Sequence, residues 1–235
     1  MIKMVLFDLD GTLLPMDQEV FIKAYFGGIV KRLVNYGYEP DKLIKGIWEG
    51  TMNMVKNDGS KTNEEVFWNR FCELFGDKAR LDEPHFEEFY INDFDKIQGA
   101  CGFDPNSRVV IDEIKKLGLR TVLATNPIFP RIATQKRINW AGLTTDDFEV
   151  YTTYENSSYC KPNLEYYISI INKLGVKPEE CLMVGNDVIE DMVTENLGMK
   201  VFLVTNCLIN KNNIDINKYP NGNLMDLLDY IKTLI

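Results

Sequence analysis

MIKMVLFDLDGT, residues 1–12, is the stretch that decides the fold of this chain. Residues 2–7 form a short apolar run broken only by Lys3, which is typical of a strand buried in a parallel sheet. Asp8 and Asp10 follow this run, and Gly11 lets the backbone turn tightly. Ligands of open parallel sheets bind at the carboxyl ends of the strands, so we expect both acids at a binding crevice. A solvated strand-to-loop turn is the alternative for a DxD taken alone.

The composition is that of an ordinary globular protein. The 235 residues can bury one large core or a core with an inserted domain, and 45% are apolar. No apolar run approaches the roughly 20 residues that a membrane helix needs, and the first residues do not resemble a secretion signal. We therefore expect a cytoplasmic protein with no membrane partner. The net charge of −9 also argues against a nucleic-acid partner, but not against a small phosphorylated substrate.

The cysteines and the single histidine exclude several kinds of site. The five cysteines are widely spaced without a CxxC pair, which is typical of reduced thiols and not of a zinc site or a disulfide framework. Ser-His-Asp or Cys-His chemistry would depend on His85 alone. Because His85 lies among acids in a helical stretch, far from any candidate nucleophile, we expect it to have a packing role.

Residues 16–97 are predicted to be helical throughout. Four helices begin near Asp17, Pro40, Thr62 and Pro84, where capping residues or prolines precede apolar positions at helical spacing. Four helices joined by short turns form a small bundle. The segment holds about half of the aromatic residues of the chain. A bundle core explains most of them, although some rings should face whatever the bundle covers.

Strands and helices alternate from Asp104 onward. We predict strands at 119–124, 148–152, 181–184 and 200–204, a loop at 206–223, and helices at 106–117, 130–142, 164–174, 188–197 and 224–234. Such alternation predicts a doubly wound, Rossmann-like parallel sheet of the α/β class. The core domain would comprise residues 1–15 and 98–235, and the helical bundle of residues 16–97 would be a cap domain inserted after the first strand.

Polar residues follow each predicted strand in an ordered series. Right-handed crossovers bring these strand ends to one edge of the sheet. Each residue alone has an ordinary explanation, such as a solvated lysine or an acidic first turn of a helix. Together they indicate one site: Asp8 and Asp10, then Thr125 and Asn126, then Lys161, then Asp187 and Asp191.

Phosphoryl transfer with Mg²⁺ is the chemistry that uses this set. Mg²⁺ prefers oxygen ligands, which Asp8, the Asp10 carbonyl and Asp187 can supply. A carboxylate nucleophile must overcome the repulsion of a phosphate, and the metal and Lys161 reduce that repulsion. Asp10 is placed to protonate the leaving oxygen and then to deprotonate water.

A second group of residues is placed to bind the phosphate. The Thr125 hydroxyl and the amides after it, beginning at Asn126, could hold phosphoryl oxygens near a helix start. The predicted phosphate-binding set is therefore Asp8, Thr125, Asn126 and Lys161.

These motifs together resemble the phosphatase branch of the haloacid dehalogenase superfamily: DLDGT at 8–12, Thr125, Lys161-Pro162 and the segment 185–191. The resemblance implies that Asp8 is the aspartyl-phosphate nucleophile and Asp10 the general acid and base. It also implies that Thr125 and Lys161 bind the phosphoryl group, that Lys161 steadies Asp8 and that Asp187 ligates magnesium.

One departure from the family pattern lies in the last motif. Many relatives have an acid directly after the glycine, whereas here that position is Asn186 and the acid comes next. Asn186 could coordinate through its carbonyl oxygen, and Asp191 could act behind the ligands or pair with Lys161. The division of roles among Asn186, Asp187 and Asp191 stays open.

The expected function is a Mg²⁺-dependent phosphatase for a small phosphorylated metabolite. A dehalogenase would lack the acid at Asp10, and a phosphomutase would need basic residues at the cap entrance, where residues 15–19 read PMDQE. A receiver-like domain or an inactive phosphate-binding protein is the alternative from another class. Sugar phosphates, nucleoside monophosphates and phosphoglycolate remain candidate substrates, and the protein could be a monomer or a homodimer.

Overall fold

A five-stranded parallel sheet forms the centre of the computed structural model, which describes all residues 1–235. The strands are β1 (Met4–Phe7), β2 (Arg120–Leu123), β3 (Cys181–Gly185), β4 (Lys200–Val204) and β5 (Asn221–Gly222), in the order β2-β1-β3-β4-β5. Phe7 pairs with Leu123 on one side and with Val184 on the other. The residues that follow β1, β2 and β3 therefore come level at one edge, as the sequence predicts.

Alternate residues of β1 face two different cores, so the sheet is covered on both sides. Val5 and Phe7 belong to the larger core, together with helices α6 (Asn106–Lys116) and α9 (Leu224–Lys232). Met4 and Leu6 belong to the smaller core on the opposite face, with α8 (Leu164–Leu174) and the 3₁₀ helix η5 (Met192–Leu197). This arrangement is the predicted doubly wound α/β fold.

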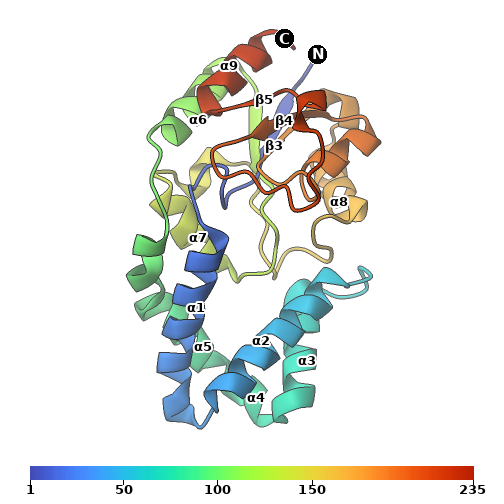
Figure 1. The fold of residues 1–235 in the computed structure, drawn as a ribbon. Coiled ribbons are helices and arrows are strands. Elements are labelled where there is room, and N and C mark those ends of the chain that lie inside the picture. Colours follow the sequence, from blue (N-terminus) through green and yellow to red (C-terminus); the bar gives the residue numbers. More distant parts are fainter.

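A helical layer, residues 18–100, lies beyond the carboxyl edge of the sheet (Figure 1). It contains α1 (Gln18–Leu33), α2 (Pro40–Val55), α3 (Asn63–Phe75), α4 (Lys78–Leu81), α5 (Glu83–Asn92) and the 3₁₀ helix η2 (Phe94–Ala100). The predicted starts are confirmed for the first three helices, with Asp17 and Thr62 as N-caps. The fourth begins at Glu83, one residue before Pro84, and α4 is an additional short turn.

Contacts of Lys136 and Trp140 with Asp95 join the helical layer to the sheet domain, and two further connections lie elsewhere. The first is the pair of linkers, where the Gly102 amide donates to the Pro15 carbonyl at 2.8 Å. The second is Asn63 at the start of α3, whose side chain is fully buried. Its Nδ2 lies 3.1 Å from the Pro127 carbonyl oxygen and 3.3 Å from that of Tyr159. The layer is therefore held to the sheet domain both at its two chain ends and at the start of α3.

Asp147 links α6 to the segment that runs beside β2. Its carboxylate accepts from Arg108 at 2.6 Å and from Lys115 at 2.8 Å, and its side chain is only 9% exposed. Burial raises the pKa of Asp147, but the hydrogen bonds from Arg108 and Lys115 lower it more, so the net pKa lies below its ordinary value. The carboxylate therefore stays charged near neutral pH.

Three predicted elements are wrong in type or extent. Residues 148–152 form a single parallel bridge between Tyr151 and Leu123 instead of a strand, although several backbone hydrogen bonds join the segment to β2. Residues 188–197 hold a turn and then η5, not an α-helix. The predicted loop 206–223 contains β5, a two-residue edge strand. None of the helices combines the length and apolar character that a membrane crossing requires.

Candidate active site

Lys161 is the centre of a buried line of charges at the carboxyl edge of the sheet. It precedes α8, is 1% exposed, and its Nζ lies 2.8 Å from Asp8 Oδ1 and 2.6 Å from Asp191 Oδ1. Burial lowers the pKa of Lys161, but the two carboxylates raise it more, so the net pKa lies well above its usual value. Burial also raises the pKa of Asp191 to about 7, against the attraction of Lys161. The Lys161 ammonium thus stays charged and lies between the carboxyl groups of Asp8 and Asp191.

The loop after β3 closes onto the loop after β1. The Thr12 hydroxyl lies 3.1 Å from Asp8 Oδ2 and 3.2 Å from Asn186 Oδ1. Asn186 Nδ2 donates to the Cys207 carbonyl at 2.6 Å, which leaves the amide oxygen to accept from the Thr12 hydroxyl. Gly11 has φ +87°, and a Cβ there would lie 2.2 Å from Asn186 Nδ2. The side chain of Asn186 is therefore joined to Asp8 through the Thr12 hydroxyl, and that of Asp191 through Lys161.

Asp187 uses part of its carboxylate within its own turn. Its Oδ1 accepts from the amides of Ile189 at 2.7 Å and Glu190 at 2.9 Å, and its own amide donates to Asp191 Oδ2 at 3.0 Å. The second carboxylate oxygen makes no bond within the protein. Asp187 lines the same cavity as Asp8, with one oxygen left for a ligand.

Asp10 forms an ion pair with Arg137, a residue that the sequence analysis missed. Arg137 comes from α7 (Arg131–Trp140), is 1% exposed, and its guanidinium lies 4.5 Å from the centre of the Phe129 ring. Burial raises the pKa of Asp10, and the charge of Arg137 lowers it in part, so the net pKa is above its ordinary value. The other oxygen of Asp10, Oδ1, is buried without a partner. Asp10 thus keeps one acceptor free.

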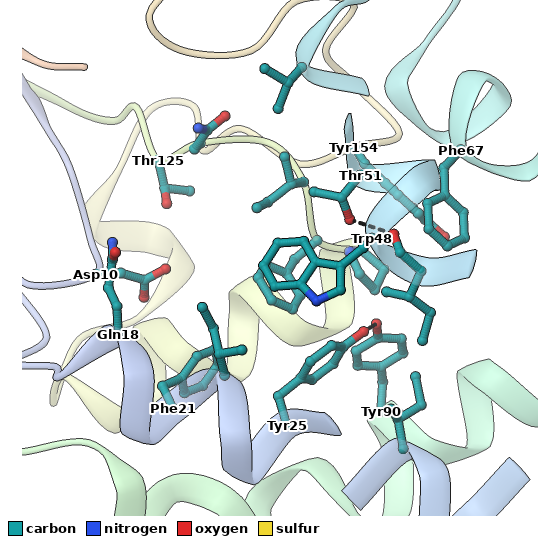
Figure 2. Close-up of a pocket in the computed structure, with 18 of the residues that line it drawn as sticks. Asp10, Gln18, Phe21, Tyr25, Trp48, Thr51, Phe67, Tyr90, Thr125 and Tyr154 are labelled. Carbon is teal, nitrogen blue, oxygen red and sulfur yellow. Dashed lines mark hydrogen bonds between the residues drawn. The ribbon is translucent and has the colours of Figure 1, made fainter. Parts of the chain in front are cut away.

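Thr125 and Asn126 lie after β2, on the opposite side of Asp8 from the Asn186 loop. The Thr125 carbonyl accepts from Thr152 at 2.6 Å and from Tyr166 at 2.8 Å, which fixes its backbone. Its hydroxyl makes no hydrogen bond within the protein and lies on the Asp10 side of the cavity in Figure 2. Asn126 instead donates its Nδ2 to Glu190 Oε2 at 3.1 Å, and its Oδ1 is buried without a partner.

The charge balance at this edge fits a bound cation. Two buried cations, Lys161 and Arg137, face an excess of carboxyl groups: Asp8, Asp10, Asp187, Glu190 and Asp191. Burial among these acids raises the pKa of Glu190 to about 7. Because crowding of acids disfavours their charged forms, a divalent cation would relieve the repulsion.

The available ligands are of the kind that Mg²⁺ takes. No three His, Cys, Asp or Glu side chains are grouped closely enough to hold a metal by themselves. Mg²⁺ usually binds one or two carboxylates and keeps several waters. The Asp8 carboxylate, the Asp10 carbonyl, the amide oxygen of Asn186 and the free oxygen of Asp187 form a fitting all-oxygen set.

A cavity of about 1030 Å³ opens between this edge and the helical layer. Asp8, Asp10, Thr125 and Asp187 line it on the side of the sheet. Aromatic side chains of the helical layer, Trp48 among them, line the other side (Figure 2). A cavity of this size can bury a metabolite-sized ligand.

Comparisons with known proteins agree with this arrangement. A model of the haloacid dehalogenase-like hydrolases matches residues 2–193. YhcW of Bacillus subtilis (strain 168), whose name suggests a phosphatase, is 24% identical over 220 residues, which cover 88% of this chain and 84% of YhcW. Pyrophosphatase PpaX of Bacillus cereus (strain AH820) is 22% identical over 204 residues, which cover 87% of this chain and 83% of PpaX.

A solved structure has the same fold. The HAD phosphatase from Thermococcus onnurineus superposes with a TM-score of 0.61 and 20% identity, and the match covers 98% of each chain. At this identity the likeness concerns the fold alone, including the helical layer beside the sheet. The family model, by contrast, spans most of the chain and all of the candidate site. This chain is therefore an enzyme of the haloacid dehalogenase-like hydrolase family, as its motifs indicate.

Proposed function

We propose that this enzyme is a Mg²⁺-dependent phosphatase that hydrolyses a small phosphate monoester through a phosphoryl group carried on Asp8. The observation that carries the proposal is the buried contact of Asp8 with Lys161 at 2.8 Å, at the mouth of a metabolite-sized cavity. The family and the phosphatase names among its relatives support the same reaction. The substrate would be a metabolite of the cytoplasm, where the five free thiols stay reduced.

Asp8 is the nucleophile in the first step. One carboxylate oxygen attacks phosphorus, the bond to the ester oxygen breaks, and the phosphoryl group is left on Asp8. The Lys161 ammonium neutralises part of the charge of Asp8 and of the phosphoryl oxygens, and the free Thr125 hydroxyl donates to one of those oxygens. Mg²⁺, held by Asp8, the Asp10 carbonyl and Asn186 or Asp187, would supply further positive charge against the repulsion between carboxylate and phosphate.

Asp10 moves the proton in both steps. In the free enzyme its carboxylate pairs with Arg137, and its raised pKa lets it take up a proton when substrate binds and donate that proton to the leaving oxygen, so that the alcohol departs neutral. The resulting carboxylate then takes a proton from the water that attacks phosphorus. Phosphate leaves, and Asp8 and the protonated Asp10 are restored. Arg137 contacts Asp10 and not the substrate, so we assign it a positioning role.

Neither a dehalogenase nor a phosphomutase fits the groups of the site as well. A dehalogenase has no use for the proton carried by Asp10, because a halide leaves without one. A phosphomutase must hold a second phosphate, and the helical layer contributes no lysine, arginine or histidine to the cavity; the basic residues of the lining, Arg131 and Lys211, come from the sheet domain. Hydrolysis is the reaction that uses all the groups present.

The test compares wild-type protein with Asp8→Asn on p-nitrophenyl phosphate. We expect wild-type hydrolysis with Mg²⁺ and none with excess chelator, and no hydrolysis by Asp8→Asn under either condition. Asp229→Asn, an exposed acid far from the cavity, is the matched control and should keep full activity. Rapid acid quenching followed by mass spectrometry should find the phosphoryl group on Asp8. Turnover by Asp8→Asn, or turnover without metal, would refute the proposal.

A further inference from the structure

The half of the cavity formed by the helical layer is lined by apolar and acidic side chains. Its lining from this layer is mainly aromatic and aliphatic, and includes no lysine, arginine or histidine. The charged residues of this layer in the lining are Glu64, Glu83 and Glu87, and Glu155 and Arg131 of the sheet domain also line the cavity. Arg80 pairs with Glu83 at 3.2 Å from outside the lining. Acidic residues therefore outnumber basic ones in this half of the cavity.

The hydroxyl groups in this half of the cavity are already satisfied. The hydroxyls of Tyr25 and Tyr90 lie 2.9 Å apart and bond to each other. The Thr51 hydroxyl donates to the Ile47 carbonyl at 2.9 Å. A ligand rich in hydroxyl groups would find partners at the carboxylates but none at the aromatic and aliphatic side chains, and unreplaced hydrogen bonds to water are costly. The apolar part of the lining thus disfavours sugars.

Trp48 offers a flat apolar surface instead. It projects from α2 into the cavity and retains 43% exposure, although it is among the largest apolar side chains of the chain. Figure 2 shows its indole between the catalytic side, marked by Asp10 and Thr125, and the far wall at Phe67. Phe26 packs against it with ring centres 5.5 Å apart. An aromatic group of a ligand could stack on the open face of Trp48.

We infer that the substrate is a phosphate monoester whose organic group is aromatic or flat and apolar and carries no second negative charge. This inference rests on the proposed phosphatase function and adds the substrate class. Pyrophosphate and phosphoglycolate bring a second anion toward Glu64, Glu83 and Glu87, and both would fill only a small part of the 1030 Å³. Hexose phosphates present hydroxyl groups where the cavity has few partners for them.

The experiment compares four phosphate esters of primary alcohols, which have similar intrinsic reactivity, with pyrophosphate, which is an anhydride. With Mg²⁺ present, kcat/KM is measured for 2-naphthylmethyl phosphate, ethyl phosphate, phosphoglycolate, glucose 6-phosphate and pyrophosphate. We expect 2-naphthylmethyl phosphate to exceed each of the others by at least about tenfold, because only its organic group can stack in the cavity. Trp48→Ala should raise KM for this ester by about tenfold and change KM for ethyl phosphate little.

Two further variant proteins serve as a control for aromatic stacking and as a test of charge repulsion. Phe103→Ala removes an aromatic ring that is 63% exposed and does not line the cavity, so it should leave all five rates unchanged. Glu64→Gln with Glu87→Gln should raise kcat/KM for phosphoglycolate more than for the naphthyl ester, because a repulsion is removed. Equal or better hydrolysis of phosphoglycolate, pyrophosphate or glucose 6-phosphate by the wild type would overturn the substrate class and leave the phosphatase proposal intact. Absence of hydrolysis of every ester would overturn both.

Discussion

Replacing Arg137 by methionine tests the ion pair that the structure places behind the reaction centre. Methionine keeps much of the volume of the side chain and removes its charge. Breaking a fully buried ion pair from one side costs about 3–5 kcal/mol. Arg137 is 1% exposed, but the Asp10 side chain retains 22% exposure and can be partly hydrated. We therefore expect Arg137→Met to lower the free energy of unfolding by about 2–3 kcal/mol.

A double-mutant cycle isolates the contribution of the pair. Asp10→Asn alone leaves the Arg137 guanidinium buried without its anion and should also cost about 2 kcal/mol. The double variant Arg137→Met with Asp10→Asn leaves neither charge, so its cost should fall short of the sum by about 2 kcal/mol. The assay is urea denaturation at neutral pH, followed by tryptophan fluorescence and repeated by circular dichroism.

The result that would refute the reasoning is additivity. If the two single costs add in the double variant to within about 0.5 kcal/mol, the residues do not interact energetically in the folded protein. A melting experiment gives an independent reading: at about 2–4 °C per kcal/mol for a protein of this size, Arg137→Met should melt about 4–12 °C lower.

Four other predictions concern separate parts of the molecule. Asp10→Asn should bind phosphate but lose turnover by about 10²–10⁴-fold on an ester with a poor leaving group, measured by steady-state kinetics; near-normal rates would contradict its role. Asn63→Ala should lower the melting temperature by about 2–6 °C, because buried carbonyls lose their donor, and should raise the hydrogen exchange of the α3 amides. Gly11→Ala should destabilise the fold by more than Gly118→Ala, since both glycines have positive φ but only Gly11 also meets a side chain; equal losses would show that the contact is unimportant. Asp147→Asn should cost about 2 kcal/mol at neutral pH. Because folding depresses the pKa of this carboxyl, its stabilisation is present above about pH 4 and is lost as the pH falls further, so the variant and the wild type should converge in acid.

The strand ends could be predicted because their pattern is local and repeated. The strand predicted at 200–204 is β4, and the one predicted at 181–184 is β3 without its last residue. Each is a continuous apolar run followed by polar residues. Once the sheet is parallel, its topology alone brings Asp8 and Lys161 to one edge, and the structure has them in contact. A long-range contact thus followed from short-range patterns.

Arg137 could not be assigned to Asp10 because nothing near Asp10 in the sequence indicates it. A partial signal does lie in α7 itself. Ala133, Thr134 and Ile138 are buried, and Arg137 shares their helical spacing, so it falls on the inward face. An arginine on such a face needs a buried anion, but its identity depends on the packing of α7 against the sheet.

The roles within the segment 185–191 also depended on three-dimensional contacts. The order of the residues left Asn186, Asp187 and Asp191 as alternatives. Asn186 is held beside Thr12, and through it near Asp8, because its amide donates to Cys207, which is 21 residues away. The bond of Asp191 to Lys161 supports one of the two roles considered for it. The predictions of the short elements were wrong for a related reason. β5 has only two residues and forms by pairing with β4, which its own composition does not indicate.

The double fastening of the helical layer has a consequence for the end of each catalytic cycle. Asn63 is bound to the carbonyls of Pro127 and Tyr159, and the chain runs from Tyr159 through Cys160 directly into Lys161. If the layer moves outward at α3 to release product, these bonds must break. Because the chain from Tyr159 to Lys161 is so short, such a movement would also act on the segment that positions the ammonium beside Asp8.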